Sequence, residues 1–291
     1  MKAKSGVPFI KMHGIGNDYI YIDALRGETP HYLKESRLPD LSRKISDRHF
    51  GVGSDGLIVI LPSDIADFRM RIFNADGSEA KMCGNGIRCV GKYVRDLGFT
   101  TKNEIDVESA SGVKHLSLVR NANETERVIV GMGSPFFRNE DIPTSGERGC
   151  EAREVVLMSR GEDFKVTPIG MGNPHGVIFV KNVDELNLSA IGPELENSPF
   201  WPDRANIEFV EVLNRGELKV RVWERGSGET WACGTGACAS VVASFRKGLS
   251  DSDVRVNLRG GTLQICYDET SNSVTMTGPA EFIAKGEFFI P

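Results

Sequence analysis

RMRIFNADGSEAKMCGNG, from Arg69 to Gly86, and KVRVWERGSGETWACGTG, from Lys219 to Gly236, are two versions of one segment. They align without a gap at a spacing of 150 residues, and each ends in Cys-Gly-x-Gly. A repeat with so long a period is typical of a duplicated domain and not of a solenoid of short units. The sequence therefore predicts two similar domains.

The repeat places a domain boundary near the middle of the 291-residue chain. The stretch from Gly131 to Pro135 has the glycine and proline content of a loop. We therefore predict an N-terminal domain over residues 1–131, completed by a C-terminal strand at 279–291, and a C-terminal domain over 132–278. A looser match of Gly16-Asn17 to Gly172-Asn173 agrees with the duplication.

Most of the chain has the pattern of short strands separated by turns. Apolar, β-branched segments predict strands at 57–61, 68–73, 128–130, 176–180, 207–213, 218–223, 254–258 and 273–277. Helices are expected at 38–49 and 184–192, and after each repeated cysteine as far as about residues 97 and 247. The predicted fold class is α/β (α+β), with more strand than helix.

Composition excludes several classes of partner. The chain has 35 Lys and Arg against 40 Asp and Glu, a net charge of −5, and no basic stripe. This charge balance gives no attraction for nucleic acid or an anionic membrane. The longest apolar run, residues 56–61, is far shorter than the roughly 20 residues of a spanning helix. The basic N-terminus lacks the apolar region of a signal peptide, so we expect a cytoplasmic protein.

The six cysteines are expected to be thiols. Structural disulfides are rare in a reducing compartment. In each half the second cysteine of the repeat faces another side of the helix, and no zinc-ligand spacing is present, so no metal is expected. Cys89 and Cys238 are expected as small apolar residues on the buried side of a helix. Cys150 and Cys266 carry no local signal and are expected in the core or on the surface.

Cys83 and Cys233 each precede Gly-x-Gly at the expected start of a helix. A helix start favours anions and can lower a thiol pKa from about 8.5 to roughly 3.5–7.5. If the halves pack about a pseudo-twofold axis, the two thiols can meet one ligand from opposite sides. Inversion of a stereocentre by proton transfer needs such an acid and base. A substrate carboxylate would lie against the N–H groups of Gly84, Asn85, Gly234 and Thr235.

The segment from Gly51 to Gly56 matches the dinucleotide-binding pattern G-x-G-x-x-G. That pattern must follow a strand and open a helix. Here it follows a helical segment and opens a strand, so we interpret it as a turn. Nothing in the chain indicates a nucleotide or pyridoxal phosphate, and no cofactor is expected.

Several motifs in order along the chain resemble the diaminopimelate epimerase family. They are MHGIGNDY at 12–19, NADGSE at 74–79, MCGNGIRC at 82–89, GNPH at 172–175, and ERG at 224–226 with ACGTG at 232–236. The resemblance spans residues 9 to 289 and implies a pyridoxal-independent epimerase that interconverts LL- and meso-2,6-diaminopimelate. This reaction serves lysine and peptidoglycan precursor synthesis. It also implies two pseudosymmetric domains, each a mixed β-barrel-like sheet around a central helix, in a cytoplasmic homodimer.

Carried onto this sequence, the resemblance makes Cys83 and Cys233 the acid/base pair. It implies that His175 and Glu224 border the site and help to set the protonation of the thiols. Amide groups and one guanidinium suit the distal ammonium and carboxylate of the substrate. The residues implied there are Asn17, Asn74, Asn173, Asn206 and Arg225, with Glu224 beside them. One family position, often Gln, falls at Gly56, which offers no side chain.

Other functions remain open from the sequence. Proline racemase-like enzymes share the Cys-Gly-x-Gly loops but typically have His where this chain has Asn85, and phenazine-type isomerases lack the paired cysteines. A thiol redox protein would use Cys83 and Cys233 as a reversible disulfide. A non-catalytic scaffold would need neither thiol. Each polar candidate also has a structural alternative, since Asn after Gly commonly forms a turn.

Overall fold

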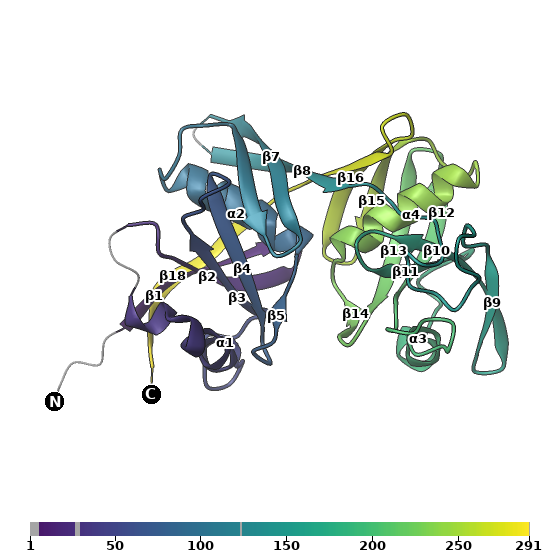
Figure 1. Ribbon diagram of the computed structural model, residues 1–291, viewed down its shortest axis with the longest axis horizontal. Helices are drawn as coiled ribbons and strands as arrows, with labels where there is room; N and C mark the ends of the chain where they lie inside the picture. Colours follow the sequence, from purple (N-terminus) through teal and green to yellow (C-terminus); the bar gives the residue numbers. More distant parts are fainter. Residues whose placement is uncertain (1–5, 27–29, 123, 291) are drawn as a thin grey trace. The chain divides into compact units, whose positions relative to one another are not determined.

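Pairing and contacts divide the chain into two units (Figure 1). The computed structural model describes residues 6–26, 30–122 and 124–290, so the first residues of the basic N-terminus lie outside the described part. One unit comprises Met1–Val130 with Gly278–Pro291, and the other comprises Gly131–Thr277. No described helix is long and apolar enough to cross a membrane.

The first unit is a mixed sheet in the spatial order β18-β1-β2-β3-β4-β6-β7-β8, with β5 beside β4. Neighbours are antiparallel except for the parallel pairs β2–β3 and β4–β6. The strands are β1 (Gly6–Gly14), β2 (Asn17–Asp23), β3 (Gly56–Leu61), β4 (Phe68–Asn74), β5 (Glu79–Ala80), β6 (Glu104–Ser109), β7 (Gly112–Asn121), β8 (Glu124–Gly133) and β18 (Glu281–Phe289).

The second unit has the same plan, in the order β9-β10-β11-β12-β13-β15-β16-β17 with β14 beside β13. Its parallel pairs, β11–β12 and β13–β15, are those that the duplication predicts. The strands are β9 (Val155–Ser159), β10 (Glu162–Gly170), β11 (Pro174–Phe179), β12 (Asn206–Asn214), β13 (Glu217–Glu224), β14 (Gly228–Thr230), β15 (Asp253–Leu258), β16 (Gly261–Asp268) and β17 (Ser273–Gly278). The predicted fold class is therefore confirmed.

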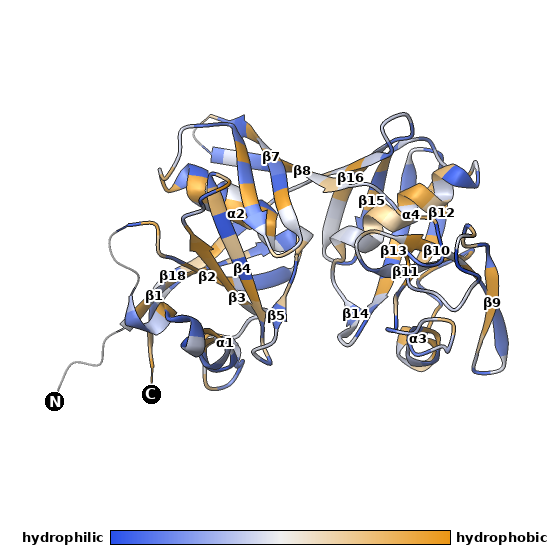
Figure 2. Cartoon of the chain, viewed as in Figure 1, coloured by the Kyte–Doolittle hydropathy of each residue, from blue (hydrophilic) through white to orange (hydrophobic). Residues whose placement is uncertain are grey.

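The sheet of each unit packs around one central helix, which is α2 (Gly84–Asp96) in the first unit and α4 (Gly234–Arg246) in the second. Both are buried around most of their circumference, because the strands curve about them. A helix buried on every side is normally apolar. Figure 2 shows that α4 follows this rule, whereas α2 mixes apolar and polar turns. Its buried Lys92 is compensated by Asp96, at 2.8 Å, and by the carbonyl of Thr125, at 2.8 Å.

All eight predicted strands and both helices after the repeated cysteines match observed elements. The predicted strand 176–180 runs one residue past the end of β11, and the predicted helices run about one residue past the ends of α2 and α4. The other two predicted helices have different bounds. Helix α1 (Leu38–Ser46) ends before residue 49 because Asp47 accepts the N–H groups of His49 and Phe50 and turns the chain. Two short 3-10 helices, His31–Leu33 and Glu35–Arg37, precede α1.

Helix α3 (Leu188–Glu196) begins later and ends later than the predicted 184–192. Asp184 donates its N–H to the side chain of Asn182 and remains in a turn. Pro193 lies inside α3 and does not end it, although the pattern predicted an end at Gly192. A Cβ at Gly192 would lie 2.4 Å from Cδ2 of Trp223, so a glycine allows this helix to pack closely on β13.

Gly56 tests the packing between β2, β3 and β4. It pairs with Tyr19 and Asn74, and a Cβ there would lie 2.2 Å from the carbonyl oxygen of Phe73. We expect Gly56→Ala to lower the free energy of unfolding by about 3 kcal/mol or more in chemical denaturation. Gly216→Ala, where the nearest atom would be 3.6 Å away, is the control and should change it by less than about 0.5 kcal/mol. Equal stability of the two variants would contradict this packing.

Candidate active site

Each repeated cysteine is the N-cap residue of the central helix in its own unit. Cys83 has extended backbone angles (φ −142°, ψ 112°), and its sulfur accepts the N–H of Gly86 at 3.3 Å. Cys233 has nearly the same angles (φ −119°, ψ 112°) and accepts the N–H of Gly236 at 3.3 Å. Both sulfurs therefore lie beside the first N–H groups of a helix, where a bound carboxylate is favoured.

Amide side chains surround Cys83 in the first unit. The side-chain oxygen of Asn17, at the start of β2, accepts from the Cys83 sulfur and from the Asn85 amide, both at 3.4 Å. Asn85 is buried in the first turn of α2, next to Gly84. Asn74 ends β4 and donates to the hydroxyl of Ser78 at 3.0 Å, within the turn to β5. The structure thus places Asn17 and Asn85 next to Cys83, whereas the side chain of Asn74 is hydrogen-bonded within a turn.

Carboxylates surround Cys233 in the second unit. Glu224, at the end of β13, accepts a hydrogen bond from the hydroxyl of Thr230, and its charge acts on the Cys233 thiol by raising the pKa of that thiol. The hydroxyl of Thr235 lies 3.5 Å from the sulfur. Cys233 is buried, with 5% of its surface exposed, whereas Cys83 is partly exposed.

We call the residues around each repeated cysteine its half-site. The half-site of Cys233 includes a buried pair, His175 with Glu208. His175 Nδ1 is 2.7 Å from a Glu208 oxygen, and both side chains are fully buried. His175 Nε2 is 2.9 Å from the side-chain oxygen of Asn173. The second Glu208 oxygen has no hydrogen-bond partner in the described part of the chain. A Cβ on Gly236 would lie 2.6 Å from Glu208 Oε1, so this carboxylate reaches the first turn of α4.

Asn206 and Arg225 are neighbours in this unit. Asn206, which pairs with His175 between β11 and β12, accepts the backbone N–H of Arg225 at 2.9 Å. The Arg225 guanidinium is exposed and donates to the carbonyl of Asp203 at 3.1 Å. The structure therefore brings the predicted residues of this unit into one region, with Gly234 in the first turn of α4.

Sequence reasoning missed Glu208. The signal for it was a charged residue among apolar neighbours in the predicted strand 207–213, since a carboxylate on a buried strand needs a partner. Sequence reasoning also expected helix starts to lower thiol pKa values. For Cys233 this expectation is wrong: burial, followed by the charges of Glu224 and Glu208, raises its pKa well above that of a free thiol. Burial likewise raises the pKa of Glu224.

Sheet register shows how the two halves diverged. The parallel pair Tyr19–Gly56 of the first unit corresponds to His175–Asn206 of the second. Along the same alignment, Ile58 occupies the place of Glu208, and Asn74 the place of Glu224. The Cys83 sulfur is therefore contacted by an amide side chain, whereas the groups next to Cys233 are carboxylates.

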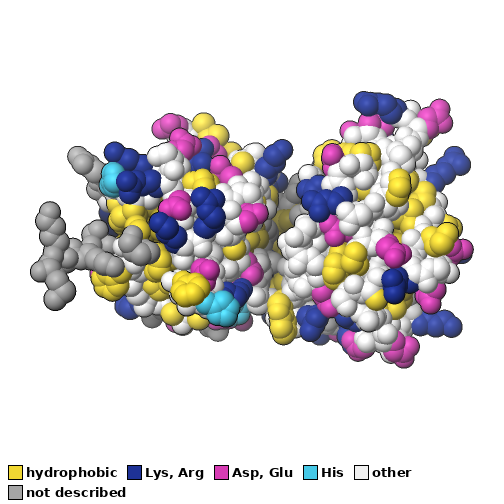
Figure 3. Space-filling model, turned by 90° about the horizontal axis from the view of Figure 1, so that it is seen from below, with side chains coloured by type: hydrophobic (Ala, Val, Ile, Leu, Met, Phe, Trp, Pro, Cys, Tyr) yellow, Lys and Arg dark blue, Asp and Glu magenta, His cyan; other side chains and the backbone are white. Residues whose placement is uncertain are grey.

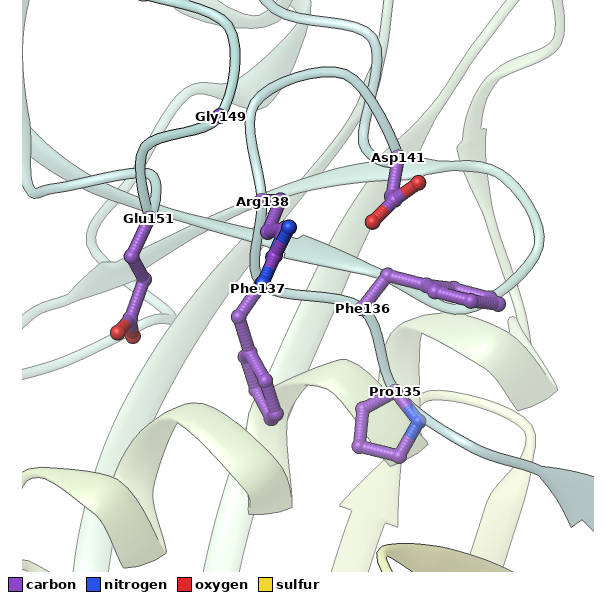
Figure 4. A pocket seen from close by; sticks show the side chains of 7 residues that line it. All are labelled: Pro135, Phe136, Phe137, Arg138, Asp141, Gly149 and Glu151. Atoms are coloured by element: carbon purple, nitrogen blue, oxygen red, sulfur yellow. The ribbon is translucent and has the colours of Figure 1, made fainter.

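Other surface features of the second unit contain none of the predicted residues. A hollow of about 480 Å³ is lined by residues between Pro135 and Glu151, among them Phe136 and Phe137. Figure 4 shows the side chains that line it. Among the described residues there is no cluster of three or more His, Cys, Asp or Glu able to hold a metal. Figure 3 shows basic and acidic side chains interspersed over one face, without a stripe of either sign.

The fold defines a known structural class. A hydroxyproline epimerase from Agrobacterium vitis, solved with trans-4-hydroxy-L-proline, superposes with a TM-score of 0.70. The match covers 99% of this chain and 93% of that one, at 14% identity. At this identity the similarity establishes a shared fold.

Sequence comparison gives the family. The profile of the diaminopimelate epimerase family matches residues 9–137 and 167–283. Diaminopimelate epimerase from Acetivibrio thermocellus is 52% identical over 279 residues, which cover 96% of this chain and 97% of that protein. The enzyme of the same name from Desulfovibrio desulfuricans is 48% identical, covering 97% of this chain and 98% of that protein. The chain belongs to the diaminopimelate epimerase family.

The raised pKa of Cys233 predicts its reactivity. Near pH 9 a free thiol is largely ionised, but Cys233 should remain a thiol because the raised pKa moves its ionisation to higher pH. Site-resolved alkylation with iodoacetamide should therefore give Cys233 a midpoint above that of free cysteine measured in the same buffer. Glu224→Gln removes a neighbouring charge and should lower the midpoint of Cys233. Glu229→Gln is the control, because Glu229 is paired with Arg221. A wild-type midpoint for Cys233 at or below that of free cysteine would contradict the assignment.

Proposed function

We propose that this chain converts LL-2,6-diaminopimelate to meso-2,6-diaminopimelate without a cofactor, using Cys83 and Cys233 as the acid/base pair. The observation that carries the proposal is the matched N-cap geometry of the two cysteines. The curated relatives with this name, at 52% and 48% identity over nearly the whole chain, support the choice of substrate.

The chemistry requires the two half-sites to meet one substrate. One thiolate removes the proton from the α-carbon, and the electron pair passes into the adjoining carboxylate. The thiol on the opposite face then donates its proton to the same carbon, so one thiol and one thiolate remain at the end. The N–H groups of Gly84, Asn85, Gly234 and Thr235 would stabilise the negative charge that develops on the carboxylate.

The distal amino-acid group of the substrate would be held by polar side chains from both units. It carries an ammonium and a carboxylate, which amides and a guanidinium can bind together. Arg225 suits this role because its guanidinium is exposed. The amides proposed for it are Asn17, Asn74, Asn173 and Asn206. His175 and Glu224 would set the protonation of Cys233, since the charge of Glu224 raises the pKa of that thiol.

We also propose a cytoplasmic homodimer. The described cysteines are free, and thiol catalysis needs a compartment that keeps them reduced. Strand β18 is exposed along nearly its whole length, and its exposed apolar side chains include Ile283 (50% exposed) and Phe289 (54% exposed). Apolar side chains gathered on a strand are typical of an interface.

Replacing either thiol tests the two-base assignment. Cys83→Ala and Cys233→Ala should each lower the rate of epimerisation about 10²-fold or more, because each removes a proton-transfer group. Turnover is measured on reduced protein in D₂O, where the wild type should incorporate deuterium at the reacting α-carbon. Cys150→Ala and Cys266→Ala, at exposed cysteines away from both helix starts, should keep wild-type activity.

Three outcomes would overturn the proposal. Turnover retained in either thiol variant would exclude the two-base mechanism. Equal rates on diaminopimelate and proline would exclude recognition of a distal amino-acid group. A wild-type protein that epimerises no substrate but forms a reversible disulfide between Cys83 and Cys233 would favour a redox protein.

The dimer proposal has its own test. Ile283→Asp places a charge on the exposed strand β18 and should convert the dimer to a monomer in light scattering coupled to size exclusion. Val156→Asp, which changes an exposed apolar residue on β9 (57% exposed), is the control and should leave the dimer intact. A wild-type monomer would contradict the proposal.

A further inference from the structure

The turn from Gly51 to Gly56, which resembles a nucleotide motif by coincidence, holds a carboxylate against the first half-site. Asp55 is fixed by its backbone: its N–H donates to Asp18, and its carbonyl accepts the N–H of Ala75 at 3.0 Å. Its side chain is also held. One oxygen accepts from Arg48 at 2.9 Å, and the other accepts the N–H of Asp18 at 3.1 Å. A carboxylate tied at this many points has a defined position.

The Asp55 oxygen that accepts the N–H of Asp18 also accepts a hydrogen bond from the side-chain nitrogen of Asn17, at 2.7 Å. A carboxylate can only accept, so it selects the NH₂ end of the Asn17 amide. The amide oxygen must then point the other way. There it lies 3.4 Å from the Cys83 sulfur and 3.4 Å from the Asn85 nitrogen.

We propose that Asp55 is a positioning residue of the Cys83 half-site: it orients Asn17 so that an oxygen, and not an N–H, faces the Cys83 sulfur. An amide oxygen accepts the S–H proton and offers nothing to a thiolate. The orientation therefore favours the thiol form of Cys83. Without Asp55 the Asn17 amide can rotate by half a turn and donate an N–H to the thiolate. The proposal concerns only the half-site of Cys83. It adds to the proposed function a residue that influences the protonation of this thiol without touching it.

The charges around Cys83 must be accounted for in any pH experiment. Tyr21 and Cys89 face it from β2 and α2, and burial keeps both neutral in the relevant range by raising their pKa values, that of Cys89 to about 11. Arg88 of α2 is a constant positive charge near Gly84. On the side of Asp55 lie Arg48 and Asp18, with Lys11 paired to Asp18 at 2.8 Å.

Asp18 supplies a matched control. Its carboxylate contacts the same Arg48, at 3.2 Å, and also Lys11. Asp18→Asn therefore removes one negative charge from the same cluster while the Asp55–Asn17 contact remains. A general effect of lost charge will appear in both variants, and an effect of amide orientation only in Asp55→Asn.

The experiment measures carbamidomethylation of Cys83 against pH by peptide mass spectrometry in the full chain. Asp55→Asn should lower the midpoint by about one pH unit relative to Asp18→Asn, the scale of one hydrogen bond to a charged group. Asn17→Ala alone should also lower the midpoint, because it removes the oxygen, and it leaves the Arg48–Asp55 pair in place. This second variant tests the idea if Asp55→Asn does not fold.

A double-variant cycle separates positioning from charge. In the Asn17→Ala background, Asp55→Asn should produce no shift beyond that of Asp18→Asn. Equal midpoints for Asp55→Asn and Asp18→Asn in the wild-type background would overturn the proposal. An undiminished shift in the Asn17→Ala background would also overturn it, because Asp55 would then act as a charge alone. These readouts need no substrate, so they are independent of whether the chain epimerises diaminopimelate.

Discussion

Enclosure of a helix by its own sheet is the constraint on which both half-sites depend. Strands cover the sides of α2 and α4, so chemistry is available only at a helix end. The cysteine sulfur meets one of the N–H groups that the helix start leaves without an acceptor. The second glycine of Cys-Gly-x-Gly is required by packing: a Cβ at Gly86 would lie 2.6 Å from Ile58 Cδ1, and one at Gly236 would lie 2.6 Å from Glu208 Oε1.

Duplication supplied two copies of this helix start, and substitution on the surrounding strands made them chemically different. The neighbours of Cys233 are carboxylates, and burial with their charge favours its thiol form. Around Cys83 the corresponding places hold Ile58 and Asn74. The amide of Asn17 contacts the Cys83 sulfur, and the carboxylate of Asp55 contacts that amide. The two helix starts are therefore alike in backbone geometry and different in the groups around the sulfur.

The repeat carried most of what the sequence could predict. Strand patterns and the Cys-Gly-x-Gly loops located the β-rich fold and both central helices, because local periodicity and capping act over a few residues. The end of α3 was mispredicted because tertiary packing of Gly192 on Trp223 carries the helix past Pro193. Glu208 and Asp55 were missed because their importance comes from partners 33 and 38 residues away, His175 and Asn17. Such pairings depend on sheet register, which a single sequence does not specify.

Strand β18 occupies in the first unit the place that β9 occupies in the second, at the outer side of the first long strand of each sheet. Strand β9 directly precedes its partner in the chain, whereas β18 pairs with β1 from the opposite terminus. During synthesis the second unit can complete its sheet as soon as its own residues emerge from the ribosome. The first unit must wait for the last residues of the chain, so the half made first is the half finished last.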